Sequence, residues 1–250
     1  MKLTVISSTA DILGEPARPS IISQKDSQLL YGEQFQVEKA RGAYVYGHSV
    51  LDGYQGYVER AQLIKDALSS THFVKVRASH LYPEPSFKSR PLTRLSFMSR
   101  VTLTTNSENG FTQLSDQSWI FSNHIAPMKD FTKSGDLAQT AEIYLGTPYL
   151  FGGRSAFGID CAGLVQVVVY ACGHACPLRD SCDQEGSFGT PIKRDDVQRN
   201  DIVYFKGHVG IMMDDKNILN ATARHMTTLI EPLSDLEAAY DGGITHIARL

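Results

Sequence analysis

One stretch of the sequence, residues 149–166, combines a glycine-rich turn with the start of a helix, and a cysteine lies where the two meet. The turn-forming residues end at Gly158, and apolar residues recur at helical spacing after Cys161. Cys161 is therefore expected in the first turn of a helix, where unpaired N–H groups and the helix dipole favour a thiolate. The neighbouring Asp160 opposes this, because an adjacent anion raises the pKa of a thiol unless a cation lies beside it. The stretch predicts a reactive cysteine.

The composition is that of an ordinary globular protein and excludes several classes of partner. Of the 250 residues, 42% are hydrophobic and 20% are charged, and the formal net charge is −3. No basic run interleaved with aromatics occurs, so we expect no nucleic-acid partner. No apolar run of about 18 residues occurs, so we expect no membrane span. The short apolar run at the start does not fit a signal peptide, which predicts a cytoplasmic protein.

The four cysteines, Cys161, Cys172, Cys176 and Cys182, lie in one short region. This clustering does not fit a disulfide framework spread over a secreted fold. A zinc site that combines His174 with the last three cysteines is an alternative, but the spacing lacks the paired C-x-x-C form. We favour reduced thiols and expect neither a metal nor another cofactor.

The chain divides into three segments by its patterning. Residues 1–66 contain short β-type runs, and the same order of motifs restarts in residues 71–128 with shorter connections. Two small β-barrels in tandem are therefore predicted. Residues 134–250 begin with helical patterns and continue with apolar strands, which indicates an α+β domain.

A cysteine nucleophile needs a base, and the base needs a third group that fixes its orientation. His208 opens one arm of a predicted hairpin, and Asn220 lies in the other arm. A three-residue turn at 214–216 places Asn220 opposite Gly210 and diagonal to His208, whereas a four-residue turn places the two side chains on opposite faces. His225 is the rival base, although it lies beyond the return strand.

Five motifs of the third segment resemble those of the NlpC-type cysteine peptidases, papain-like enzymes that cut peptidoglycan stem peptides. The motifs are residues 144–155, 158–166, 179–184, 200–205 and 208–211. The two β-units resemble the bacterial SH3-like domains of those members that cleave between γ-D-glutamate and a diamino acid in peptides with a free N-terminal L-alanine. For each β-unit, a generic barrel without a binding role is the alternative. The expected fold class is α+β, a papain-like domain preceded by two all-β SH3-like barrels.

The resemblance implies a role for each residue that matches a family motif. Cys161 would be the nucleophile, His208 the base and Asn220 the third member, with Tyr149 near the oxyanion site. Asp160 would hold the amine of the substrate, which would supply the cation beside it. The other residues implied in substrate binding are Arg179 and Ser181, for the D-glutamate portion, and Glu33 and Tyr54, which would close the amine pocket from the first barrel.

Three positions depart from the family pattern. The family usually has Trp where Phe151 stands, Ser where Ala162 stands and His where Asn220 stands. Asn is also the papain solution for the third member, so this departure is compatible with activity. Ala162 removes a hydroxyl from the expected amine pocket, and Phe151 loses an N–H donor. These changes bear on substrate preference.

The function expected from the resemblance is a bacterial endopeptidase of cell-wall recycling. It would hydrolyse the bond between γ-D-Glu and the diamino acid, such as diaminopimelate, in a murein peptide with a free N-terminal L-Ala. Two alternatives remain open: a catalytically degenerate protein that binds wall peptides, and an amidase or acyltransferase of the same papain-like class.

Overall fold

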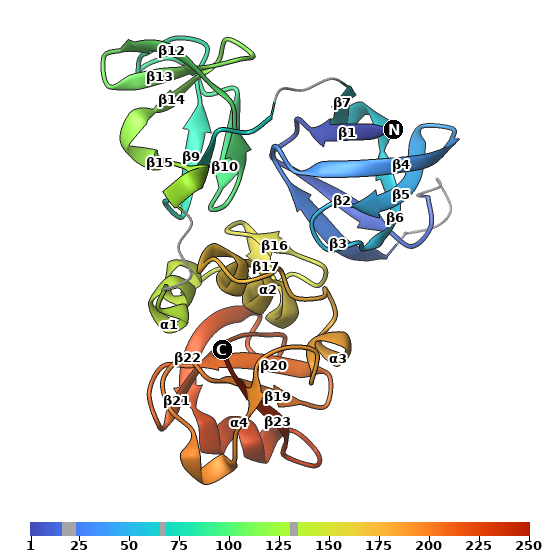
Figure 1. Cartoon of the computed structure of the whole chain (residues 1–250), viewed down its shortest axis with the longest axis vertical. Helices are drawn as coiled ribbons and strands as arrows, with labels where there is room; N and C mark the ends of the chain where they lie inside the picture. The colour runs from blue at the N-terminus through green and yellow to red at the C-terminus, as the bar shows by residue number, and fades with distance from the viewer. Residues whose placement is uncertain (17–23, 66–68, 131–134) are drawn as a thin grey trace. The chain divides into compact units, whose positions relative to one another are not determined.

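The structure is a computed structural model that describes residues 1–16, 24–65, 69–130 and 135–250 (Figure 1). Its contacts divide the chain into two units, residues 1–131 and 132–250. The boundaries predicted at residues 66 and 134 lie outside the described residues. Among the described residues, no helix is long and apolar enough to span a membrane.

The first part of unit 1 is an antiparallel sheet of seven strands in the order β3-β2-β6-β5-β4-β1-β7. Side chains alternate between buried and partly exposed along β5, as expected for a strand with one face on a core. The core includes Leu3, Ile12, Phe35 and Val58. The strands are β1 (Lys2–Val5), β2 (Thr9–Leu13), β3 (Lys25–Leu30), β4 (Gln34–Arg41), β5 (Tyr44–Ser49), β6 (Gln55–Glu59) and β7 (Leu63–Lys65).

The second part of unit 1 has its own strands and its own hydrophobic core, which includes Val74, Leu95 and Ile120. Its sheets have the orders β10-β9, β11-β8-β15 and β12-β13-β14. Tyr31 from the first part packs against this core, and its hydroxyl donates to Asp116 at 3.0 Å. The strands are β8 (His72–Val74), β9 (Ala78–Leu81), β10 (Thr93–Ser96), β11 (Arg100–Val101), β12 (Leu103–Glu108), β13 (Phe111–Leu114), β14 (Trp119–Phe121) and β15 (Ile125–Pro127).

Unit 2 is built on an antiparallel sheet of six strands in the order β18-β23-β19-β20-β21-β22. Helix α2 packs against β20 and β21, and nine of its residues are buried, so it is apolar on nearly every side (Figure 1). The helices are α1 (Leu137–Ala141), α2 (Cys161–Ala171), α3 (Ser181–Gln184) and α4 (Leu233–Ala239). The strands are β16 (Arg154–Ser155), β17 (Gly158–Ile159), β18 (Thr190–Pro191), β19 (Ile202–Phe205), β20 (His208–Met212), β21 (Asn217–Thr222), β22 (Thr227–Pro232) and β23 (Ile244–Arg249).

Five short 3-10 turns complete the secondary structure of the described residues. They are Arg60–Gln62, Ser122–His124, Met128–Asp130, Glu142–Tyr144 and Arg194–Asp196.

The register of the β20–β21 hairpin decides whether His208 and Asn220 lie on the same face of the sheet, as a catalytic group of Cys161, His208 and Asn220 requires. Ile211 pairs with Leu219 and Met212 pairs with Ile218. The N–H of Met213 donates to the carbonyl of Asn217 at 2.8 Å, which leaves residues 214–216 as the turn. Continuing this register sets Asn220 opposite Gly210, so Asn220 and His208 share a face of the sheet. The predicted three-residue turn is therefore confirmed.

Candidate active site

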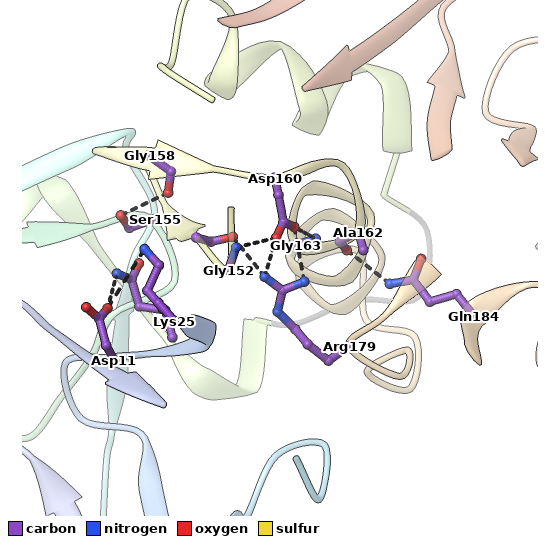
Figure 2. A network of polar contacts seen from close by, with 12 residues as sticks. Asp11, Lys25, Gly152, Ser155, Gly158, Asp160, Ala162, Gly163, Arg179 and Gln184 are labelled. Carbon is purple, nitrogen blue, oxygen red and sulfur yellow. Dashed lines mark hydrogen bonds and ion pairs between the residues drawn. The ribbon is translucent and has the colours of Figure 1, made fainter. Parts of the chain in front are cut away.

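Cys161 is the first residue of α2 and is 8% exposed. Asp160 caps this helix, because its carboxylate accepts from the N–H of Gly163 at 2.7 Å. The other carboxylate oxygen accepts from the N–H of Gly152 at 2.7 Å, which ties the glycine-rich turn to the helix (Figure 2). The side chain of Asp160 thus fixes both the glycine-rich turn and the start of α2, where Cys161 lies.

Asp160 is also paired with Arg179, and both side chains are buried. The guanidinium donates to the two carboxylate oxygens at 3.0 and 2.7 Å, as Figure 2 shows. With the two backbone N–H groups, four donors reach a carboxylate that offers about four acceptor positions. The cation beside Asp160 is therefore Arg179, a residue of the chain itself. From the sequence, the substrate amine was expected in that place. Substrate binding by Asp160 and Arg179 stays a prediction.

His208 and Asn220 meet on the sheet as the register requires. The imidazole Nε2 lies 3.0 Å from the amide Oδ1, and both side chains are buried. The amide Nδ2 of Asn220 donates to Glu231 at 3.0 Å, so its Oδ1 is the atom turned toward His208. An acceptor at this position requires the proton on Nε2, which leaves Nδ1 as the basic atom of the neutral ring.

The sulfur of Cys161 lies beside the start of β20. The backbone N–H groups of Val209 and Ala162 point at the sulfur and favour its thiolate form, lowering its pKa. Val209 directly follows His208, so the hydrogen bond from Val209 brings the nucleophile to the strand end that carries the base. This arrangement provides a nucleophile, a base and an orienting group, as in a papain-like triad.

Burial decides the charge state of the pair. It raises the pKa of the Cys161 thiol to about 12, and the charge of Asp160 raises it further, whereas the N–H groups of Val209 and Ala162 and the guanidinium of Arg179 lower it. Burial also lowers the pKa of His208 to about 4, although the contact with Asn220 opposes it. The helix start alone predicted a thiolate, but desolvation outweighs it, so the ligand-free protein holds a neutral thiol and a neutral imidazole.

Two tyrosines flank the pair. Burial and the proximity of Cys161 and Asp160 raise the pKa of Tyr149 well above its usual range, so its phenol stays protonated and able to donate. The ring of Tyr240 stacks on His208 with centroids 4.9 Å apart and an interplanar angle of 9°. Tyr240 was missed in the sequence, because nothing in its local pattern after α4 distinguishes it.

The remaining predicted residues of unit 2 lie at different depths. Ala162 is buried, and its carbonyl accepts from the buried Gln184 at 3.0 Å (Figure 2). Phe151 is 55% exposed in the glycine-rich turn, and Ser181 is the first residue of α3. The structure thus places Ala162 directly beside the nucleophile, and a role in substrate binding stays a prediction for all three predicted residues.

Glu33 and Tyr54 belong to unit 1, where each has local partners. The buried carboxylate of Glu33 accepts from the N–H of Leu30 at 3.0 Å. Tyr54 packs against the core of the first barrel. Their proposed part in an amine pocket stays a prediction.

The described residues contain no group of three or more histidines, cysteines or carboxylates arranged to hold a metal ion. Within the described part of the chain all four cysteines are free, with Cys182 exposed.

Two stretches of the chain match known protein families. Residues 146–240 match the NlpC/P60 family, and residues 17–63 match the bacterial dipeptidyl-peptidase SH3 domain. The SH3 match falls in the first predicted barrel, so the second barrel stays a prediction.

Two relatives and one solved structure align with most of this chain. A gamma-D-glutamyl-L-lysine dipeptidyl-peptidase of Bacillus subtilis is 28% identical over 89% of this chain and 80% of its own length. Dipeptidyl-peptidase 6 of Lysinibacillus sphaericus is 26% identical over 85% of this chain and 84% of its own. The crystal structure of an NlpC/P60 family protein from Bacillus cereus superposes with a TM-score of 0.85 over 100% of this chain and 99% of that chain, at 21% identity, and shows the shared fold. The chain is therefore a cysteine peptidase with an NlpC/P60 catalytic domain and a bacterial SH3 domain of the dipeptidyl-peptidase type.

Proposed function

We propose that this cysteine peptidase acts on cell-wall peptides and hydrolyses the bond between γ-D-Glu and a diamino acid in murein peptides with a free N-terminal L-Ala. The observation that carries the chemistry is the Cys161, His208 and Asn220 arrangement at the start of α2 and on the face of β20 and β21. The substrate class is supported by the relatives named gamma-D-glutamyl-L-lysine dipeptidyl-peptidase. A place in cell-wall recycling, in the cytoplasm of a bacterium, is part of the proposal.

The reaction starts from the neutral pair. Nδ1 of His208 takes the thiol proton as the sulfur of Cys161 attacks the γ-carbonyl carbon of D-Glu. In this proposal the phenol of Tyr149 donates to the oxyanion that forms, and its raised pKa keeps the proton on the phenol. Loss of the amine of the diamino acid, which receives the proton from His208, leaves a thioester on Cys161.

Water completes the cycle. His208 takes a proton from water, which attacks the thioester carbonyl, and the thiol leaves with that proton. The products are L-Ala-γ-D-Glu and the free diamino acid. Because both steps require His208 to be neutral at the start, its low pKa of about 4 suits work at neutral pH.

The test is mass spectrometry of L-Ala-γ-D-Glu-meso-diaminopimelate and of its L-Lys analogue after incubation with the protein. We expect cleavage after D-Glu by the wild type, none by Cys161→Ala, and none when the peptide is N-acetylated. Cys182→Ala is the matched control, because it removes an exposed thiol of the same unit and is expected to leave the rate unchanged. Binding of the peptide without turnover would favour the wall-peptide binding protein, and a product cut at another bond would favour the amidase.

A further inference from the structure

Glu231 contacts the end of the Asn220 amide that is opposite to the end facing His208. Its Oε1 accepts from Asn220 Nδ2 at 3.0 Å, while Asn220 Oδ1 lies 3.0 Å from His208 Nε2. An amide has one end that donates and one that accepts, and rotation by half a turn exchanges them. A carboxylate only accepts, so it selects the orientation in which the amide oxygen faces His208.

The three side chains share one face of the sheet. Asn220 pairs with Leu229 in β22, and Glu231 lies two residues further along the same strand. His208 lies two residues before Gly210, the position opposite Asn220. Side chains alternate along a strand, so His208, Asn220 and Glu231 form a diagonal across β20, β21 and β22.

The three side chains of this diagonal are largely buried, which makes the hydrogen bonds among them important. The side chain of Glu231 is 10% exposed, and those of Asn220 and His208 lie deeper still. Arg224 donates to both carboxylate oxygens at 3.4 and 3.2 Å from the turn between β21 and β22. The guanidinium of Arg224 thus holds the carboxylate of Glu231 on one side, and the amide of Asn220 donates to it on the other.

We propose that Glu231 is a positioning residue of the peptidase, which fixes the Asn220 amide so that His208 keeps its proton on Nε2 and Nδ1 remains the base. The effect on turnover rests on the proposed function, whereas the effect on the tautomer of His208 does not.

Without the carboxylate, the amide of Asn220 can turn and present its NH2 to Nε2 of His208. The ring then holds its proton on Nδ1, and the atom that receives the thiol proton is no longer basic. This change affects proton transfer by His208 in the chemical step, and it leaves unchanged the residues predicted to bind the substrate. The loss is therefore expected in kcat and not in KM.

The experiment compares Glu231→Met with Glu231→Gln. Met removes the acceptor while it keeps much of the volume, and Gln keeps an oxygen that can accept from Asn220. Glu237→Met is the matched control, because Glu237 is a carboxylate of the same unit that pairs with Arg194 on the surface. The readouts are kcat and KM on the murein tripeptide, and the tautomer of His208 from imidazole nitrogen shifts, assigned with His208→Gln.

We expect Glu231→Met to lower kcat by roughly 10- to 100-fold with little change in KM, and to move His208 toward the Nδ1–H tautomer. Glu231→Gln is expected to recover most of kcat and the Nε2–H tautomer, and Glu237→Met to match the wild type. A Glu231→Met protein with the wild-type tautomer overturns the proposal even if its rate falls. A wild type that shows the Nε2–H tautomer, lost in Glu231→Met, but cleaves no peptide refutes the proposed function and leaves the positioning role standing.

Discussion

The imidazole Nε2 of His208 and the amide Oδ1 of Asn220 lie 3.0 Å apart at buried positions on neighbouring strands. We expect Asn220→Ala to lower kcat by roughly 100-fold, because the ring loses the acceptor that fixes its tautomer. Asn220→His is expected to recover a large part of the rate, since an imidazole nitrogen can take the place of the amide oxygen. The measurement is steady-state kinetics on the murein tripeptide. Equal rates for Asn220→Ala and the wild type would remove Asn220 from the catalytic group.

The second prediction concerns the pH dependence of thiol alkylation. The pKa of Cys161 is raised to about 12, and the thiolate is the form that reacts with iodoacetamide. The alkylation rate of Cys161 in the free protein is therefore expected to rise about tenfold per pH unit between roughly pH 7 and 9. Mass spectrometry of the peptide that contains Cys161 gives the rate separately from the other cysteines. A rate that is already constant below pH 7 would mean a preformed ion pair with His208.

The third prediction concerns stability in acid. The pKa of His208 is about 4 in the folded protein and near 6.5 in an unfolded chain, so between these values only the unfolded state binds the proton. The free energy of unfolding of unit 2 is thus expected to fall as the pH drops from about 6.5 to 4, by up to about 3 kcal/mol. Above pH 6.5 the contribution of His208 to the free energy of unfolding is constant.

The check is urea unfolding followed by far-UV circular dichroism at pH 7 and 4.5, with His208→Gln as the comparison. Burial also lowers the pKa values of His72 and His124, both in unit 1, so the wild type alone mixes the two units. The variant is expected to lose less stability between the two pH values than the wild type. An identical loss would show that His208 does not contribute.

The fourth prediction concerns the buried pair of Asp160 and Arg179. Removing one partner leaves the other charged and buried, so Arg179→Met and Asp160→Asn are each expected to cost about 3 kcal/mol of unfolding free energy. The double variant is expected to cost less than the sum of the two, by about 1 to 3 kcal/mol. The exposed pair of Arg194 and Glu237 is the control, for which the same cycle is expected to give under about 1 kcal/mol. Additive costs at Asp160 and Arg179 would contradict the coupling.

Much of the catalytic group could be predicted because each member follows from local pattern. The place of Cys161 follows from a glycine-rich turn and helical spacing, and the shared face of His208 and Asn220 follows from the length of one turn. These signals lie within a few residues or within a single hairpin.

The contacts that sequence reasoning missed all join residues from separate elements. Arg179 reaches Asp160 from the segment before α3, and Tyr240 stacks on His208 from the end of α4. Glu231 becomes visible only once the register of β21 and β22 is known. The charge state of Cys161 also could not be predicted without the structure, because burial depends on tertiary packing and not on the helix start alone.

The carboxylate of Asp160 holds the helix cap, the glycine-rich turn and the guanidinium of Arg179 in place at once. The bonds that place the nucleophile are therefore the same bonds that hold the start of α2. On heating, Cys161 is therefore expected to keep its position for as long as α2 stays packed on the sheet. Thermal inactivation is thus expected to coincide with the melting of unit 2, which tryptophan fluorescence would not report, because the single tryptophan, Trp119, lies in unit 1.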